Sequence, residues 1–186
     1  MADPRFTIAE TRLAGVISIA RRRMSDERGF LSRIYCDEDL ASVGLGGPIR
    51  QINQTLTLRR GTIRGMHFQY PPHAEGKLIS VLQGSIFDVA IDIRAGSPTL
   101  LRWHGEQLSA ENGRSLFVPP GCAHGFQTLT DNCVLLYLHT ASYDPAAEGA
   151  LSVFDPAVAI DWPLEVTDIS ARDSAHLPLP QDFNGI

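Results

Sequence analysis

Three side chains near the middle of the chain can exchange protons or stabilise charge close to neutral pH. His67 and Lys77 occur in one glycine-bounded segment, and His124 follows the turn Pro119–Gly121. An imidazole, whose pKa lies near neutrality, can take a proton from a carbon atom. A lysine ammonium can stabilise the negative charge that this proton loss leaves behind. These residue types therefore favour acid–base chemistry.

A metal centre is the alternative for the same region. Its ligands would come from His67, His73, Glu75 and His124. A bound cation needs three or four converging His or carboxylate ligands. The ammonium of Lys77 would repel a cation, and His73 and Glu75 follow Pro71–Pro72 in an expected loop. We therefore predict that the protein binds no metal at this site.

The elements that hold these side chains are predicted to be β-strands. Between Ile86 and Arg94 apolar and polar residues alternate, as in a strand with two different faces. The apolar face consists of Phe87, Val89, Ile91 and Ile93, and the other carries Asp88, Asp92 and Arg94. A second alternating run, Val134–His139, places Tyr137 and His139 on the same side as Leu135. Asp88, Tyr137 and His139 are thus each assigned to one face of a strand.

Two further segments, Gln51–Leu58 and Leu78–Leu82, are rich in β-branched or apolar residues and are bounded by glycine or proline. Turn signals recur at short intervals, as at Gly96–Pro98 and Pro119–Gly121. Many short strands separated by such turns are typical of a β-sandwich or small barrel. Short helices are expected only near Asp37–Val43 and in the C-terminal tail. The predicted fold class is all-β.

The composition is that of an ordinary globular protein. The 186 residues are 44% hydrophobic and 20% charged, which is enough to bury a core. A net charge of −5 gives no reason to expect binding to nucleic acid or to a membrane. The three cysteines show no paired spacing, and the N-terminus shows no signal peptide. We expect one cytoplasmic domain over residues 1–186.

The segment Gly113–His124, with the sequence GRSLFVPPGCAH, resembles the second sequence motif of the cupin fold. Its glycine, proline, Pro-x-Gly turn and histidine fall at the cupin offsets. The first cupin motif would run from Gly61 to Gly84, with His67 at its first ligand position. The next two ligand positions hold Gln69 and Lys77 instead of histidine and glutamate. The resemblance implies a jelly-roll barrel that has lost its metal ligands.

Longer stretches resemble the dTDP-4-dehydrorhamnose 3,5-epimerase family. They are DERGF at Asp26–Phe30, GTIRGMHFQYPPHAEGKL at Gly61–Leu78, FDVAIDIRAGSPT at Phe87–Thr99, PPGCAHGF at Pro119–Phe126, and IDWP with ISARD between Ile160 and Asp173. The resemblance implies a cofactor-free homodimer that epimerises a nucleotide-linked 4-keto-6-deoxyhexose. The usual family reaction converts dTDP-4-dehydro-6-deoxy-D-glucose into dTDP-4-dehydro-L-rhamnose, which serves polysaccharide biosynthesis.

The resemblance also implies four catalytic roles. His67 would remove the protons at C3 and C5, which flank the C4 ketone, and Asp173 would hold the tautomer of His67. Lys77 would face the oxygen of the intervening enolate. Tyr137, a phenol with an ordinary pKa near 10, would return a proton to the opposite face. Outside the family these residues would be a core histidine, a surface acid, an exposed lysine and a core tyrosine.

Seven further residues are expected, by the same resemblance, to bind the substrate. They are Gln51, Asn53, Arg64, Asp88, His124, Glu148 and, reaching in from a second subunit, Arg28. Guanidinium groups suit a diphosphate. Strict alternation puts Arg64 on the opposite face of its strand from His67. Either Gly65 marks a β-bulge that turns the strand, or Arg64 lies outside the pocket.

Two positions depart from the family pattern. Leu138 stands where a lysine commonly follows the catalytic tyrosine, and Ser142–Tyr143 replaces a pair of aromatic residues. These departures leave open the nucleotide (dTDP, CDP or GDP) and whether C3, C5 or both are inverted. Two other functions also stay open, a metal-dependent cupin isomerase or oxygenase and a non-catalytic sugar-binding cupin.

Overall fold

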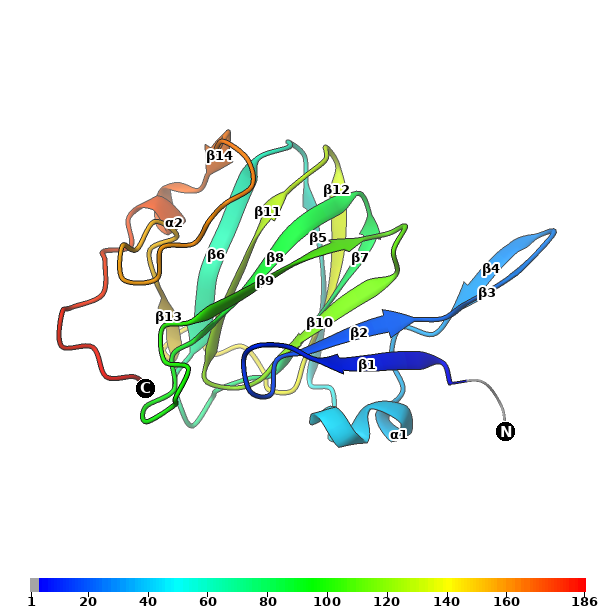
Figure 1. Cartoon of the computed structure of the whole chain (residues 1–186), viewed down its shortest axis with the longest axis horizontal. Coiled ribbons are helices and arrows are strands. Elements are labelled where there is room, and N and C mark those ends of the chain that lie inside the picture. Colours follow the sequence, from blue (N-terminus) through cyan, green and yellow to red (C-terminus); the bar gives the residue numbers. More distant parts are fainter. Residues whose placement is uncertain (1–3) are drawn as a thin grey trace.

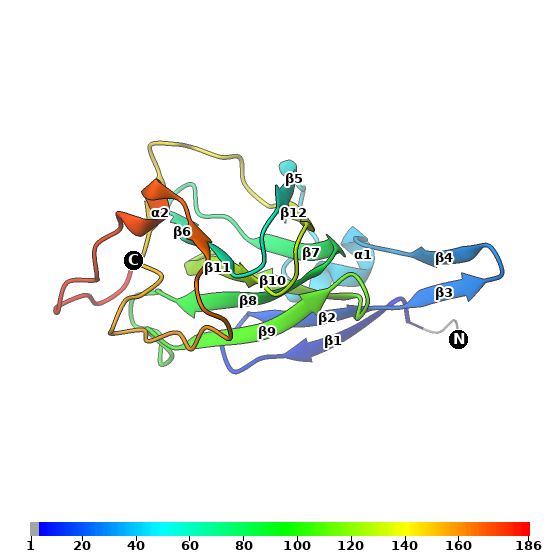
Figure 2. The same ribbon diagram turned by 90° about the horizontal axis from the view of Figure 1, so that it is seen from above.

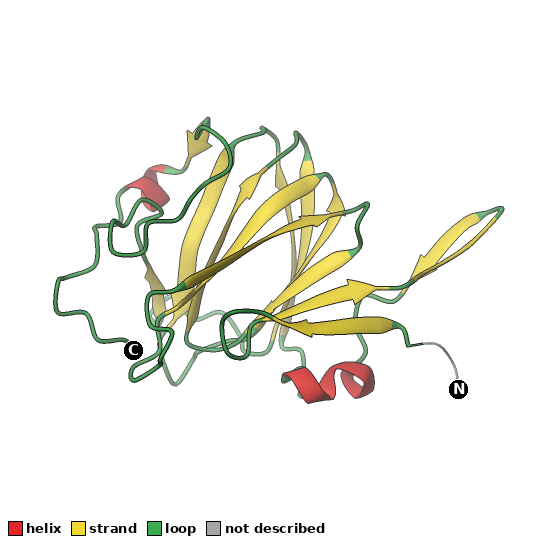
Figure 3. Cartoon of the chain, in the orientation of Figure 1, coloured by secondary structure: helices red, strands yellow, loops and turns green. Residues whose placement is uncertain are grey.

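Two antiparallel sheets lie face to face in the structure, a computed structural model that describes residues 4–186 (Figures 1 and 3). The first contains, in spatial order, β1 (Phe6–Glu10), β2 (Ile17–Arg21), β10 (Arg114–Val118), β7 (Lys77–Gln83), β12 (Cys133–His139) and β5 (Gln51–Thr57). The second contains β13 (Glu148–Ala150), β6 (Thr62–Gln69), β11 (Cys122–Thr128), β8 (Ser85–Asp92) and β9 (Trp103–Ser109). A short strand, β14 (Asp168–Ile169), runs parallel to β6. The predicted all-β fold class is confirmed.

A hairpin and three short helical segments lie outside these sheets. β3 (Arg23–Asp26) and β4 (Gly29–Ser32) form an arm that projects from the sandwich (Figure 2). The other segments are α1 (Asp37–Leu40), the 3-10 helix η1 (Ala41–Val43) and α2 (Ala171–Ser174). The helices expected near Asp37–Val43 and in the tail are therefore confirmed. Across residues 4–186 no helix is long and apolar enough to cross a membrane.

The inner core lies between the two sheets and is built from alternate residues of each strand. The first sheet supplies Ile79, Val81, Leu116, Val118 and Leu135, and the second supplies Ile86, Ala90, Leu108, Cys122 and Phe126. Burial of these side chains is the main term that stabilises the fold. The same inward rows continue into polar residues, since Lys77 precedes Ile79 and Tyr137 follows Leu135 along their strands. The strands that build the core therefore also present the polar side chains.

The outer face of the second sheet is buried as well, beneath the C-terminal segment. Val89, Ile91 and Ile93 are fully buried there. They belong to one cluster with residues of the C-terminal segment, among them Leu151, Val153 and Val158. The apolar face predicted between Ile86 and Arg94 thus packs against the end of the chain. Asp88, on the opposite face of β8, points between the sheets.

A β-bulge interrupts β6 where it pairs with β11. His67 lies opposite His124 and Arg64 lies opposite Phe126, so β6 has one extra residue over this interval. Gly65 adopts a φ of 149°, and a Cβ atom at this position would lie 2.7 Å from the Cα atom of Gly125. Only glycine tolerates both this conformation and this close approach. The bulge turns Arg64 and His67 toward the same side of the sheet. Of the two alternatives left open by the sequence, the structure therefore has the one with a β-bulge at Gly65.

We expect Gly65→Ala to lower the free energy of unfolding by about 1–3 kcal/mol or more, because its methyl group would meet the β11 backbone at an unfavourable φ. Gly47→Ala is the control, since a Cβ atom at Gly47 would have no neighbour within 4 Å. Urea unfolding of both variants and the wild type measures the effect. Equal midpoints for the two variants would show that the close approach at Gly65 is not required.

Candidate active site

A pocket opens between the sheets where the inward residues become polar. Its inner part is lined by Asn53, Thr55, Arg64, His67, Lys77, His124, Phe126, Tyr137 and His139. An adjoining outer part adds Gln51, Gln69, Glu75, Tyr143 and Glu148. The structure thus brings most of the predicted site residues together. Asp173 lies behind His67, and Asp88 lies behind His124. Of the site residues predicted from the sequence, only Arg28 lies elsewhere.

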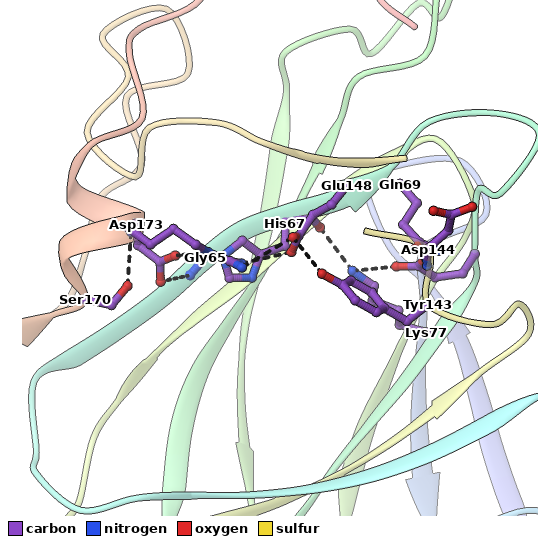
Figure 4. A network of polar contacts seen from close by, with 11 residues as sticks. Gly65, His67, Gln69, Lys77, Tyr143, Asp144, Glu148, Ser170 and Asp173 are labelled. Atoms are coloured by element: carbon purple, nitrogen blue, oxygen red, sulfur yellow. Dashed lines mark hydrogen bonds and ion pairs between the residues drawn. The ribbon is translucent and has the colours of Figure 1, made fainter. Parts of the chain in front are cut away.

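His67 and Asp173 form a hydrogen-bonded pair at the wall of the pocket. The Nε2 atom of His67 lies 2.9 Å from Oδ1 of Asp173, whose side chain is buried (Figure 4). Asp173 is fixed by α2, where its backbone N–H donates to the N-cap hydroxyl of Ser170. The Gly65 N–H donates to the other carboxylate oxygen at 3.4 Å. If Asp173 accepts the Nε2 proton, Nδ1 is the ring nitrogen with a free lone pair.

The surroundings keep His67 neutral near pH 7. Burial lowers the pKa of His67, and the nearby charges of Lys77 and Arg172 lower it further, while Asp173 acts in the opposite direction. A neutral imidazole can accept a proton, whereas an imidazolium cannot. The geometry and the charge of the pair therefore both suit a general base.

Lys77 extends from β7 toward β6 and lines both parts of the pocket. Its ammonium donates to the backbone oxygen of His67 at 3.1 Å and lies 2.9 Å from Oε1 of Glu75. The Gln69 amide contacts the same Glu75 carboxylate and donates to the His73 backbone oxygen. Lys77 is almost fully buried, and this pairing offsets the cost of desolvating its charge. A cation is thus held in the pocket wall beside His67.

Tyr137 faces His67 from the other sheet. Burial, with a smaller effect from the charge of Asp88, raises the pKa of Tyr137, so the phenol stays protonated at neutral pH. Its ring stacks on His139 and meets His124 edge to face, both at 6.2 Å between centroids. A protonated phenol and a neutral imidazole therefore stand on opposite walls of one pocket.

His124 and Asp88 form a second histidine–carboxylate pair. Nε2 of His124 lies 2.8 Å from Oδ1 of Asp88, and both side chains are buried between the sheets. The carboxylate fixes the orientation of the imidazole, and the other Asp88 oxygen has no hydrogen-bond partner. The pairing of these two residues agrees with the arrangement expected from the sequence, and their contact with substrate stays a prediction.

The predicted substrate-binding residues take different positions. Gln51 and Asn53 reach the pocket from β5, and the β6 bulge brings Arg64 to the same side. Glu148 stands at the rim, where it binds Arg172 at 2.9 Å and accepts a hydrogen bond from Tyr143. Arg172, on α2, is a rim residue that the sequence reasoning missed.

Arg28 lies away from the pocket of its own chain. It occupies the turn of the β3–β4 arm, where it binds Asp26 at 2.6 Å with 84% of its side chain exposed. Phe30 and Leu31 on the same arm are exposed apolar side chains. Within one chain the arm therefore contributes nothing to the site.

The sequence also gave no prediction for two histidines, one that lines the pocket and one outside it. His139 lines both parts of the pocket, although the alternation of Val134–His139 had already placed it on the side of Tyr137. Burial, and then the charge of Lys77, lowers the pKa of His139 to about 4. His176 follows α2 close to the His67–Asp173 pair. No spacing or motif in the sequence singles out His176.

The ligand set proposed for a metal centre does not converge. His124 is paired with Asp88, Glu75 with Lys77, and His73 lies 3.4 Å from Asp144. In the described part of the chain, one group of three potential ligands has its ligand atoms within 4.8 Å of one another, and it consists of His67, Asp173 and His176. The four residues named from the sequence therefore do not form one site.

Sequence comparison finds relatives over nearly the whole chain. The model of the dTDP-4-dehydrorhamnose 3,5-epimerase family matches residues 10–181. An enzyme of this name from Sinorhizobium fredii is 41% identical, covering 91% of this chain and 85% of that protein. One from Methanothermobacter thermautotrophicus is 40% identical over 98% of each chain. A dTDP-4-dehydrorhamnose 3-epimerase from Streptomyces niveus is 35% identical, covering 91% and 82%.

Solved structures show the same fold. The dTDP-4-dehydrorhamnose 3,5-epimerase of Bacillus anthracis, solved with TDP and pyrophosphate, is 36% identical with a TM-score of 0.90, covering 94% of this chain and 99% of that one. The Legionella pneumophila enzyme, solved with dTDP-4-keto-L-rhamnose, is 37% identical with a TM-score of 0.86, covering 92% and 91%. The jelly-roll fold implied by the sequence is thereby confirmed.

The low pKa of His139 predicts a pH dependence of stability. An unfolded histidine binds its proton near pH 6.5, whereas folded His139 binds it near 4. The unfolded state therefore holds more protons in this window, so this residue makes stability fall as the pH drops from about 6.5 to about 4. NMR titration should give His139 a midpoint near 4, with His139→Gln assigning the signal. A midpoint near 6.5 would contradict the burial argument.

Proposed function

Because the chain belongs to the dTDP-4-dehydrorhamnose 3,5-epimerase family, we propose that it epimerises a dTDP-linked 4-keto-6-deoxyhexose at C3 and C5. The observation that carries the proposal is the placement of His67 and Tyr137 on opposite walls of one pocket, on β6 and β12. Inversion at carbon requires a proton to leave one face and another to arrive at the opposite face. A base and an acid on facing walls meet this requirement.

The first step is proton removal by His67. Its neutral imidazole takes the proton through Nδ1, while Asp173 holds the Nε2 proton and stabilises the imidazolium that forms. The C4 ketone makes the neighbouring C–H bonds acidic, because loss of the proton gives an enolate. General-base catalysis of this kind contributes about 10²–10⁴-fold to a rate.

Lys77 stabilises the enolate. Its ammonium lies beside His67 in the pocket wall, so a sugar whose C3 or C5 hydrogen faces His67 brings its C4 oxygen toward this cation. Glu75 and the His67 backbone oxygen hold the ammonium in place before the reaction begins. A preorganised charge lowers the barrier without reorganisation during the step.

Tyr137 then returns a proton to the opposite face. Burial keeps its phenol protonated until the enolate is present, and an enolate carbon is basic enough to take the proton. The sugar in the pocket is further held by His124 with Asp88. The diphosphate and base are bound by Arg64, Gln51 and Asn53, with Glu148 at the rim.

We further propose a cytoplasmic homodimer whose single domain spans residues 1–186. The projecting β3–β4 arm, with exposed Phe30 and Leu31, has the features of a segment that packs on a second copy. In that arrangement Arg28 would reach the nucleotide bound by the other subunit. The unpaired Cys36, Cys122 and Cys133 agree with a reducing compartment.

Incubation with dTDP-4-keto-6-deoxyglucose in heavy water tests the proposal. We expect two deuterons, at C3 and C5, by mass spectrometry and proton NMR. A single deuteron would restrict the activity to one carbon. No exchange with dTDP-, CDP- or GDP-linked ketosugars would refute the epimerase assignment.

His67→Asn should reduce exchange at both carbons by about 10²–10⁴-fold, because the base is lost. Nucleotide binding, measured by calorimetry, should stay near the wild-type value. His73→Asn is the matched control, since His73 lies in a loop and pairs with Asp144. Wild-type exchange in His67→Asn would remove this residue from the mechanism, and loss of activity in His73→Asn would revive the metal-centre alternative.

Tyr137→Phe should separate exchange from inversion. His67 can still remove a proton and return a deuteron to the same face, so exchange should continue while inverted product falls by about 10²–10⁴-fold. NMR of the sugar ring protons reports both events in one sample. Inversion at the wild-type rate would exclude Tyr137 as the acid.

A further inference from the structure

His176 has a buried ring nitrogen without a partner. Its Nε2 atom is shielded from solvent and forms no hydrogen bond within the described residues. Burying such an atom unpaired costs free energy, and an ion or water commonly explains it. The epimerase mechanism above makes no use of His176. Its position beside α2 therefore needs another explanation.

The neighbours of His176 form a set of metal ligands. One ring nitrogen each from His67 and His176 and one oxygen from Asp173 lie within 4.8 Å of one another. Two imidazoles and one carboxylate are a common ligand set for Zn²⁺ and similar divalent ions, with the fourth position left open. A groove lined by Thr62, Asp168, Ser170, Arg172 and Asp173 adjoins the substrate pocket, shares Arg64 and His67 with it, and so reaches two of the three ligands.

The charges around this set do not exclude a cation. Asp173 is negative, and Arg172 and Lys77 are the positive groups that act on His67. Arg172 lies 3.4 Å from His67 Nε2 and 3.8 Å from Oδ1 of Asp173, so it must leave both atoms for an ion to bind. Its side chain is half-exposed and also binds Glu148 at 2.9 Å, so it can move toward the rim. Lys77 is bound to Glu75 at 2.9 Å.

We propose that His67, Asp173 and His176 form a site for a divalent ion of the Zn²⁺ type, and that the ion inhibits the enzyme. Nε2 of His67 is the nitrogen beside Asp173, so it is the atom that would bind the ion. Metal binding at Nε2 places the remaining ring proton on Nδ1. His67 then has no lone pair to accept a proton from the sugar. The inhibition rests on the proposed function, whereas the binding does not.

Binding is tested first without substrate. Protein freed of metal with a chelator is titrated with Co²⁺, followed by its visible spectrum, and with Zn²⁺ in a calorimeter. We expect one site in the wild type and in His73→Gln, and binding weaker by about tenfold or more in His176→Gln. Equal affinity in His176→Gln, or no binding to the wild type, would overturn the proposal.

A measurement on the wild type alone guards against a misfolded variant. Zn²⁺ should shift the imidazole ¹H–¹⁵N signals of His67 and His176 and leave those of His73 unchanged. Shifts of the His73 signals alone, or no shift of the His67 and His176 signals, would also overturn the site.

The heavy-water assay tests the inhibition. Zn²⁺ should stop exchange in the wild type, a chelator should restore it, and His176→Gln should keep its full basal rate and need at least about tenfold more Zn²⁺ for the same inhibition. Identical inhibition of both proteins would refute the proposed mode of action. A metal-free wild type without any exchange would refute the proposed function instead, and the binding experiments would still decide the site.

Discussion

The pocket depends on one constraint, that charged groups buried between two sheets must be paired. Three pairs meet it: His67 with Asp173, His124 with Asp88, and Lys77 with Glu75. Two of the pairs join different elements, β6 with α2 and β11 with β8, so pairing also fixes where those elements lie. The same contacts that offset desolvation set the tautomer of each histidine and the position of the ammonium. Stability and preorganisation of the site therefore have a common origin.

Much of this arrangement could be predicted from sequence. Period-two alternation placed Tyr137 and His139 on one face of a strand, and turn signals indicated a sandwich. The resemblance to known sequence motifs supplied the pairing of His67 with Asp173, since residues so far apart in the chain give no local signal. Alternation also identified the apolar face of β8. It could not tell which face was inside, because the C-terminal segment buries the second face of that sheet.

What could not be predicted follows from local geometry. A β-bulge at Gly65 was one of two alternatives from the sequence, and the choice depends on the close approach of Gly65 to Gly125, which the sequence does not show. Leu138, which departs from the family pattern, packs in the outer core of the first sheet and not in the pocket, so this departure leaves the inner site unchanged. Tyr143, by contrast, lines the rim and binds Glu148. Of these two departures from the family pattern, only the one at Ser142–Tyr143 reaches the pocket, and it does so at the rim.

His67 and Asp173, which form the hydrogen-bonded pair of the candidate general base, lie far apart in the chain. The strands that line the inner pocket, β5 to β12, all precede α2 in the chain, whereas the carboxylate that orients His67 comes from α2. A chain cut ahead of α2 would keep the residues of the inner pocket and lose the hydrogen-bond partner of its imidazole. The proposed base therefore depends on a short helix that belongs to neither sheet.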